Sequence, residues 1–193
     1  MLPARADRVW FVNDFGAPAG DLQLEEWYVS QVASPVKTEV IRGEGLIGVT
    51  LFALPSTNAP EPHPAAFQFG DTIHLMQFTL LPFADHTGYW PGDVLPITLE
   101  WSVDRRPEAD YTVGVYLLDA SGALRAQQDG FAGFGFRSTS VWLPGQRITD
   151  NHGLLLPDNL PPGEYQVAVA LYDWQTNQRL AARDASGPLQ DNL

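Results

Sequence analysis

The sequence predicts a mainly β protein: an antiparallel β-sandwich, jelly-roll-like or Ig-like, preceded by a small strand-helix-strand-strand unit. Apolar and polar residues alternate with period two in residues 95–103, 111–117 and 165–171, which is typical of strands that bury one face. Turn-forming sequences such as Pro161-Pro162-Gly163 separate these segments at even spacing. Apolar residues recur at helical spacing most clearly in residues 22–33, before the first of these alternating segments.

The N-terminal unit is assigned to residues 1–58. Its first segment is β-branched and aromatic, which predicts a short buried strand. Leu24, Trp27 and Tyr28 recur at helical spacing, and Pro35 ends the helix. A Gly-Glu-Gly sequence then joins two further apolar segments as a hairpin. The predicted elements are a strand at 8–12, a helix at 22–33, and strands at 36–42 and 46–54.

The sandwich is assigned to residues 59–193. Residues 55–65 hold four prolines and no periodicity, so they form the best linker candidate between the two units. Short strands bounded by turn residues follow, as expected for a sandwich. They are predicted at 66–69, 72–82, 94–103, 110–118, 123–129, 139–142, 147–156, 164–173 and 178–183.

Composition excludes several classes of partner and site. The chain has 193 residues, a formal net charge of −12 and no cysteine. Nucleic-acid binders need a basic stripe, and anionic lipid attracts basic segments, so neither is an expected partner. Because the chain has no cysteine, disulfides, thiol nucleophiles and Cys-type zinc sites are excluded. The longest apolar stretches are too short to cross a bilayer, so a soluble chain is expected.

Sequence motifs for catalysis are weak throughout. The chain lacks the Gly-x-Ser-x-Gly elbow, and its four histidines are far apart in sequence. Ser138-Thr139-Ser140 near His152 offers a nucleophile and a base, but a polar strand edge explains this cluster better. The 23 acidic residues supply many arbitrary carboxylate pairs, which keeps a glycoside hydrolase only as a second alternative.

No cofactor is predicted. A structural calcium ion is kept as an alternative. β-Sandwich modules bind calcium through Asp side chains and loop carbonyls. Asp71, Asp150 and Asp173 are suitable ligand types, but no EF-hand-like spacing supports them.

Aromatic side chains near strand ends are the candidate ligand contacts. A sugar-binding surface needs exposed rings that stack on C–H groups, with polar side chains nearby for the hydroxyls. Tyr89, Trp90, Trp142 and Trp174 lie in predicted loops or at strand ends and are assigned to ligand binding; ordinary packing is the alternative reading. By contrast, Trp101, Tyr111 and Tyr165 fall on predicted core faces.

The second half of the chain resembles a known family. It contains, in order, PGDVLPITLEWSV (91–103), DYTVGVYLLDASGALRAQQD (110–129), TSVWLPGQRITD (139–150) and LLLPDNLPPGEYQVAVALYDWQTNQRL (154–180). These segments resemble the C-terminal extracytoplasmic β-sandwich of bacterial GT-C-type membrane glycosyltransferases, which are related to dolichyl-phosphate-mannose protein mannosyltransferases. With RVWFV and VIRGEGLIGVTLFALP, the resemblance covers roughly residues 8–183. It implies a periplasmic or cell-surface location and a membrane-embedded parent protein.

These observations favour a non-catalytic accessory module that binds a glycan or glycoconjugate. The family's catalytic aspartates lie in loops near membrane helices, and no such part matches this chain, so no catalytic residue is assigned. A strand-like run that begins at Val9 predicts a piece of a longer protein. The alternative is a structural or protein-interaction sandwich without a small ligand, which should present an exposed apolar patch or an open sheet edge.

Overall fold

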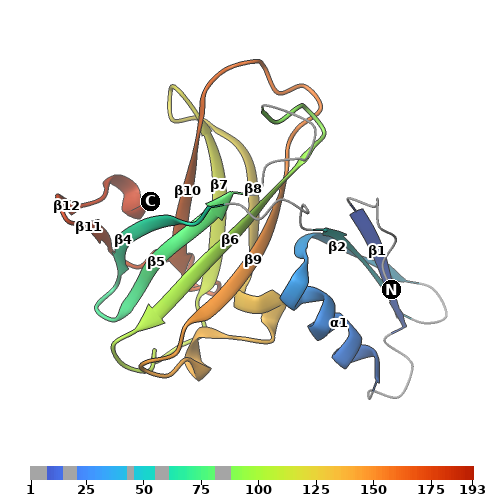
Figure 1. Ribbon diagram of the computed structural model, residues 1–193, viewed down its shortest axis with the longest axis horizontal. Helices are drawn as coiled ribbons and strands as arrows, with labels where there is room; N and C mark the ends of the chain where they lie inside the picture. The colour runs from blue at the N-terminus through green and yellow to red at the C-terminus, as the bar shows by residue number, and fades with distance from the viewer. Residues whose placement is uncertain (1–7, 15–20, 43–45, 55–60, 81–87) are drawn as a thin grey trace.

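The computed structural model describes residues 8–14, 21–42, 46–54, 61–80 and 88–193, and antiparallel sheets dominate it (Figure 1). The predicted turn at 43–45 and the boundary between residues 58 and 59 lie outside the described residues. The elements are β1 (Arg8–Asp14), α1 (Asp21–Val32), β2 (Ser34–Arg42), β3 (Leu46–Ala53), β4 (His63–Phe69), β5 (Ile73–Leu80), β6 (Val94–Val103), β7 (Thr112–Asp119), β8 (Leu124–Phe131), β9 (Ile148–Leu155), β10 (Tyr165–Tyr172), β11 (Ala182–Asp184) and β12 (Gly187–Pro188).

Two sheets face each other and form the predicted antiparallel sandwich. One has the strand order β12-β11-β4-β5-β6-β9, and the other has the order β10-β7-β8. The period-two pattern determines which side chains enter the core, because alternate residues of a strand point to opposite faces. Leu95, Ile97, Leu99 and Trp101 of β6 are all buried against the facing sheet. Tyr111 and Tyr165 pack against the same core while half-buried, as predicted.

The two sides of the sandwich are closed differently. On one side, β8 lies beside β9, and Gln128 Oε1 approaches His152 Nδ1 to 2.5 Å across the layers. On the other side, β10 pairs with β7 and makes one isolated bridge to Arg179, and the segment containing β11, β12 and Gln190–Asn192 lies beside β4 (Figure 1). The sheets are therefore joined by strand-to-strand contact on the β8–β9 side and by a covering segment on the β10 side.

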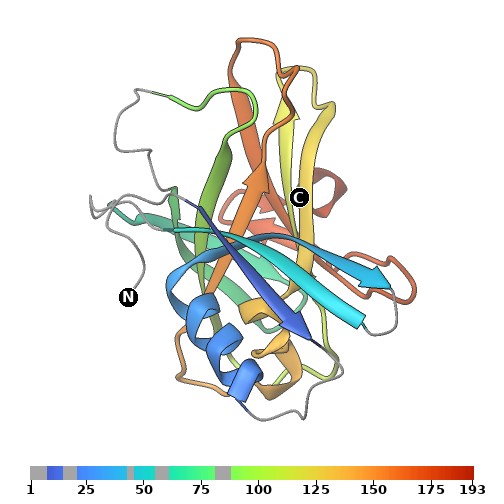
Figure 2. The same ribbon diagram turned by 90° about the vertical axis from the view of Figure 1, so that its right-hand side faces the viewer.

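The N-terminal unit has the predicted order of strand, helix, strand and strand, but its first strand is not buried as predicted, because Trp10 and Val12 of β1 are exposed. Its sheet, β1-β3-β2, crosses over the outer face of β9 (Figure 2). Asn151 Nδ2 donates to Ser30 O at 3.2 Å, and Val36 packs with Val94 in a small second core. At Gly153 an added Cβ would lie 2.7 Å from Val36 Cγ2 and 3.0 Å from a backbone oxygen, so only glycine permits this close approach.

Two predicted strands differ in the structure. The strand at 139–142 is wrong, because Thr139–Val141 forms a short 3₁₀ helix. The Thr139 hydroxyl donates to Ala109 O and accepts from Tyr111 N, and these side-chain bonds replace a strand ladder. The strand at 178–183 is displaced: Arg179 makes one isolated bridge with Tyr172, and regular pairing begins at Ala182 in β11.

Within the described part of the chain, no helix combines the length and apolar character needed to cross a membrane.

Candidate functional site

The four predicted aromatic contacts do not gather in one place. Tyr89 and Trp90 precede β6 and are 36% and 62% exposed, whereas Trp174 follows β10 and is 57% exposed. The start of β6 and the end of β10 lie at opposite ends of the sandwich (Figure 1). Trp142 is only 1% exposed and belongs to the core, where its Nε1 donates to Arg137 O. Its buried ring is not available for stacking on a ligand.

A shallow polar hollow lies on the outer face of the β10-β7-β8 sheet. Its polar and aromatic lining consists of Tyr116, Gln127, Asp129, Tyr172, Asn177 and Arg179, and we call it the tyrosine hollow. Its volume is about 390 Å³. Tyr116 alternates with Val115 and Leu117, which enter the core, so its ring is on the outward face.

Asp129 is the centre of the tyrosine hollow. The hydroxyls of Tyr116 and Tyr172 donate to its Oδ1 at 3.3 and 3.1 Å, and Gln127 Nε2 donates to its Oδ2 at 3.0 Å. The carboxylate is exposed, so several fixed donors orient a charged acceptor at the surface. Such a group can accept hydrogen bonds from a bound ligand in a defined direction.

Arg179 adds a fixed positive charge beside Asp129. Its guanidinium carbon lies 5.3 Å from the centre of the Tyr116 ring, in a cation–π arrangement. Its Nη1 also donates to Asp191 O at 3.0 Å, which holds the side chain over the ring. Gly114 makes room for Tyr116, because an added Cβ would lie 2.2 Å from the tyrosine hydroxyl oxygen.

The pKa of the Tyr172 phenol depends on this arrangement. Burial and the nearby charge of Asp129 raise its pKa to about 12. Tyr172 is therefore neutral and donates at physiological pH. The stability that follows from the raised pKa is fully present below about pH 10 and is lost as the pH rises through about 12.

We expect Asp129→Asn to lower the pKa of Tyr172 toward 10 without reaching it, because burial still raises it. Absorbance titration of the phenolates, compared with Tyr172→Phe, measures this pKa. Tyr89 is an internal control: burial and Asp93 raise its pKa to about 12, and Asp129 is not among the causes. An unchanged Tyr172 titration would contradict the network.

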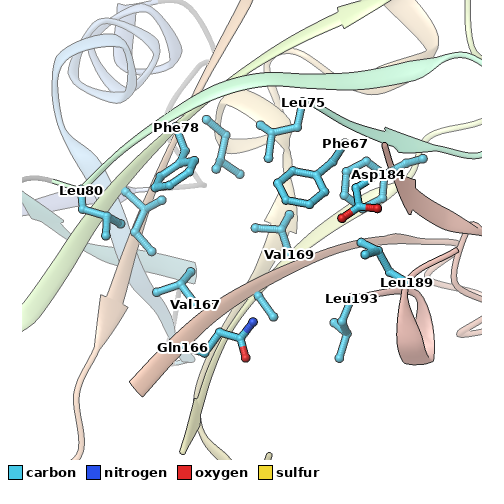
Figure 3. A pocket seen from close by; sticks show the side chains of 14 residues that line it. Phe67, Leu75, Phe78, Leu80, Gln166, Val167, Val169, Asp184, Leu189 and Leu193 are labelled. Carbon is cyan, nitrogen blue, oxygen red and sulfur yellow. The ribbon is translucent and has the colours of Figure 1, made fainter. Parts of the chain in front are cut away.

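A second cavity lies between the two sheets on the β10 side, and we call it the interlayer cleft (Figure 3). Its volume is about 420 Å³. Phe67, Phe78 and Leu80 line one wall, and Val167 and Val169 of β10 line the other. The lining is mainly apolar, and the further lining residues are Phe69, Leu75, Ile97, Leu99, Gln166, Ala168, Asp184, Leu189 and Leu193.

Asp150 and His152 form a buried polar pair inside the sandwich. His152 Nε2 lies 2.7 Å from Asp150 Oδ2, and their side chains are 2% and 1% exposed. Gly133 N donates to Asp150 Oδ1 at 2.8 Å, and Trp101 Nε1 donates to Oδ2 at 3.3 Å. The pair is thus satisfied within the core and does not open onto the tyrosine hollow.

The candidate calcium ligands are separate in the structure. Asp71 is in the exposed turn between β4 and β5, Asp150 is in the core, and Asp173 accepts hydrogen bonds from Gln175 N and Thr176 N. Among the described residues, no three His, Asp or Glu side chains come close enough to hold a metal ion together.

The residues of the tyrosine hollow were not predicted from the sequence. The alternation that placed Val115 and Leu117 in the core also places Tyr116 on the opposite face, and an outward aromatic residue in mid-strand is a usable signal. The approach of Asp129 to that tyrosine depends on the register of the β7–β8 hairpin, and the approach of Arg179 depends on the pairing of β10 with β7; the sequence pattern reveals neither.

Comparison with known proteins yields little. No family model matches the chain, and no curated protein matches it. Among solved structures, the crystal structure of an endonuclease/exonuclease/phosphatase from Beutenbergia cavernae DSM 12333 matches with a TM-score of 0.31 and 15% sequence identity. The match covers 82% of this chain and 35% of that chain. A likeness of this degree supports no statement about function.

Proposed function

We propose that this protein is a non-catalytic carbohydrate-binding module and that the tyrosine hollow is its sugar site. The oriented carboxylate of Asp129 carries the proposal. Two tyrosine hydroxyls and one amide fix it at the surface, beside Arg179. A sugar offers adjacent hydroxyl donors and acceptors, which such a cluster of charged and amide groups can recognise.

The shape of the hollow supports the same ligand class. Binding sites for small molecules combine an apolar lining with a few placed polar groups. Here Leu118 and Leu124 supply apolar surface next to the two tyrosines, while Asn177 supplies a further amide. The exposed rings of Tyr89, Trp90 and Trp174 remain proposed contacts for other parts of a glycan.

The wider setting is also proposed from the sequence. Residues 8–183 resemble the extracytoplasmic sandwich of GT-C-type membrane glycosyltransferases together with the segment that joins it to the last membrane helix, and we assign the chain to a larger, membrane-tethered or exported protein of that kind. Its contribution there is binding, with no catalytic residue of its own.

A glycan array followed by calorimetric titration, with and without Ca²⁺, tests the sugar site. We expect Asp129→Asn to weaken binding of the selected glycan about 10- to 100-fold, because a hydrogen bond to a charged group contributes about 1.5–3 kcal/mol. Glu164→Gln is the matched control, since it removes the same charge at an exposed position just before β10. Equal affinities for the two variants would exclude the tyrosine hollow as the site.

The alternative function is protein interaction through the N-terminal sheet. Trp10, Val12 and Ile41 are more than half exposed, and the register of β1-β3-β2 places them on one face. Exposed apolar patches often mark interaction surfaces. An array with no response to any sugar would favour this function over carbohydrate binding.

A further inference from the structure

The interlayer cleft is a part of the sandwich in which the core is incomplete. Near β8 and β9 the layers are in contact, and the Gln128–His152 pair joins them. Near β10 the apolar side chains of Phe67, Phe78 and Val167 remain only half-buried although they point between the sheets. A ligand that covers this half-buried apolar surface removes it from water, which stabilises the complex.

The dimensions of the cleft suit a small apolar ligand. A volume of about 420 Å³ is within the range of small-molecule sites. Gln166 and Asp184 are the two polar side chains of its lining. A peptide inserted between the sheets would bring many backbone N–H and C=O groups to walls that could satisfy few of them. A hydrocarbon chain brings none.

The polar residues determine which head group such a chain can carry. Asp184 Oδ1 accepts from Ser186 N at 2.7 Å and from Gly187 N at 3.1 Å, so the turn before β12 fixes the carboxylate. Figure 3 shows this carboxylate at the apolar lining, near Phe67 and Leu189. A second anion would be repelled there, and the net charge of −12 adds to the repulsion.

We propose that the interlayer cleft binds the hydrocarbon chain of an amphiphile whose head is an alcohol or an amine. Its chain lies between β5 and β10, and its head donates a hydrogen bond to Asp184. Fatty acids and lipid phosphates bind more weakly because their heads are anionic. This site is on the inner side of β10 and shares Leu193 but none of the polar residues of the tyrosine hollow, so it does not depend on sugar binding.

Methyl-labelled NMR tests the proposal with decanol below its solubility limit and with decylamine and decanoate below their micelle concentrations. We expect the methyl groups of Leu80, Val167 and Val169 to shift on titration with decanol and decylamine. Decanoate should bind about tenfold more weakly, because its carboxylate faces Asp184. Absence of shifts with all three compounds, or shifts confined to other methyl groups, would overturn the proposal.

Two variants separate the chain from the head group. Asp184→Asn keeps an acceptor for Ser186 N and Gly187 N, so the turn is retained, and most of the difference in affinity between decanoate and decanol should then be lost. Val169→Trp fills the cleft and should abolish binding of all three, while Val141→Trp, at an exposed position, should not. Unchanged head-group preference in Asp184→Asn would show that Asp184 does not select the ligand.

Discussion

Replacing Asp150 by alanine is expected to lower the free energy of unfolding by about 3–5 kcal/mol, because it removes one partner from a buried, hydrogen-bonded pair. His152 Nε2 would lose its neighbour at 2.7 Å, and Gly133 N and Trp101 Nε1 would lose their acceptor. These groups have no access to water, since the Asp150 and His152 side chains are 1% and 2% exposed. Each unpaired donor adds a desolvation cost.

Chemical denaturation and a thermal scan measure this loss. For a chain of this length, the expected change lowers the melting temperature by roughly 6–20 °C. Asp71→Ala is the control, because Asp71 is in an exposed turn and should change stability by less than about 0.5 kcal/mol. Similar losses in the two variants would contradict the structural role assigned to Asp150.

The second large effect is expected for Trp142→Ala, at about 3–5 kcal/mol. The indole is 1% exposed, its ring centre lies 6.0 Å from that of Trp101, and its Nε1 donates to Arg137 O at 2.7 Å. Truncation leaves a cavity in the main core and an unsatisfied carbonyl oxygen. Equilibrium denaturation of the purified variant measures the change.

Trp174→Ala is the matched comparison, because it removes the same side chain from a position that is 57% exposed. We expect it to change the free energy of unfolding by less than about 0.5 kcal/mol. If Trp174 contributes to glycan binding, the effect will instead be seen in the affinity. A large loss of stability in Trp174→Ala, or a negligible one in Trp142→Ala, would reverse the assignment of these two residues.

The sequence predicted the strands better than it predicted their partners. Alternation placed Leu95, Leu99 and Trp101 in the core because a sheet with one covered face imposes period two. The burial of Trp142 could not be predicted in the same way. This residue follows a 3₁₀ helix held by Thr139 and lies outside any strand, so the period-two pattern does not apply to it. Its burial depends on how the surrounding strands pack around it.

The tyrosine hollow was harder still to predict from the sequence. Tyr116 can be assigned to an outward face from its own strand, but Asp129 reaches it from β8 and Arg179 from the segment after β10. Register between strands determines those approaches, and register depends on turn geometry and on the packing of the whole sandwich. Exposed single rings such as Trp90 are easier to find in a sequence, although they do not form this hollow.

The pairing of β4 with β11 has a consequence for synthesis on the ribosome. Ala182 lies opposite Phe69, so this edge of the large sheet is completed by residues translated long after β4. A nascent chain therefore presents the unpaired edge of β4 while β5 to β10 are being made, and such edges are prone to pairing with other chains. Co-translational chaperones that shield strand edges would be most useful to this protein during that interval.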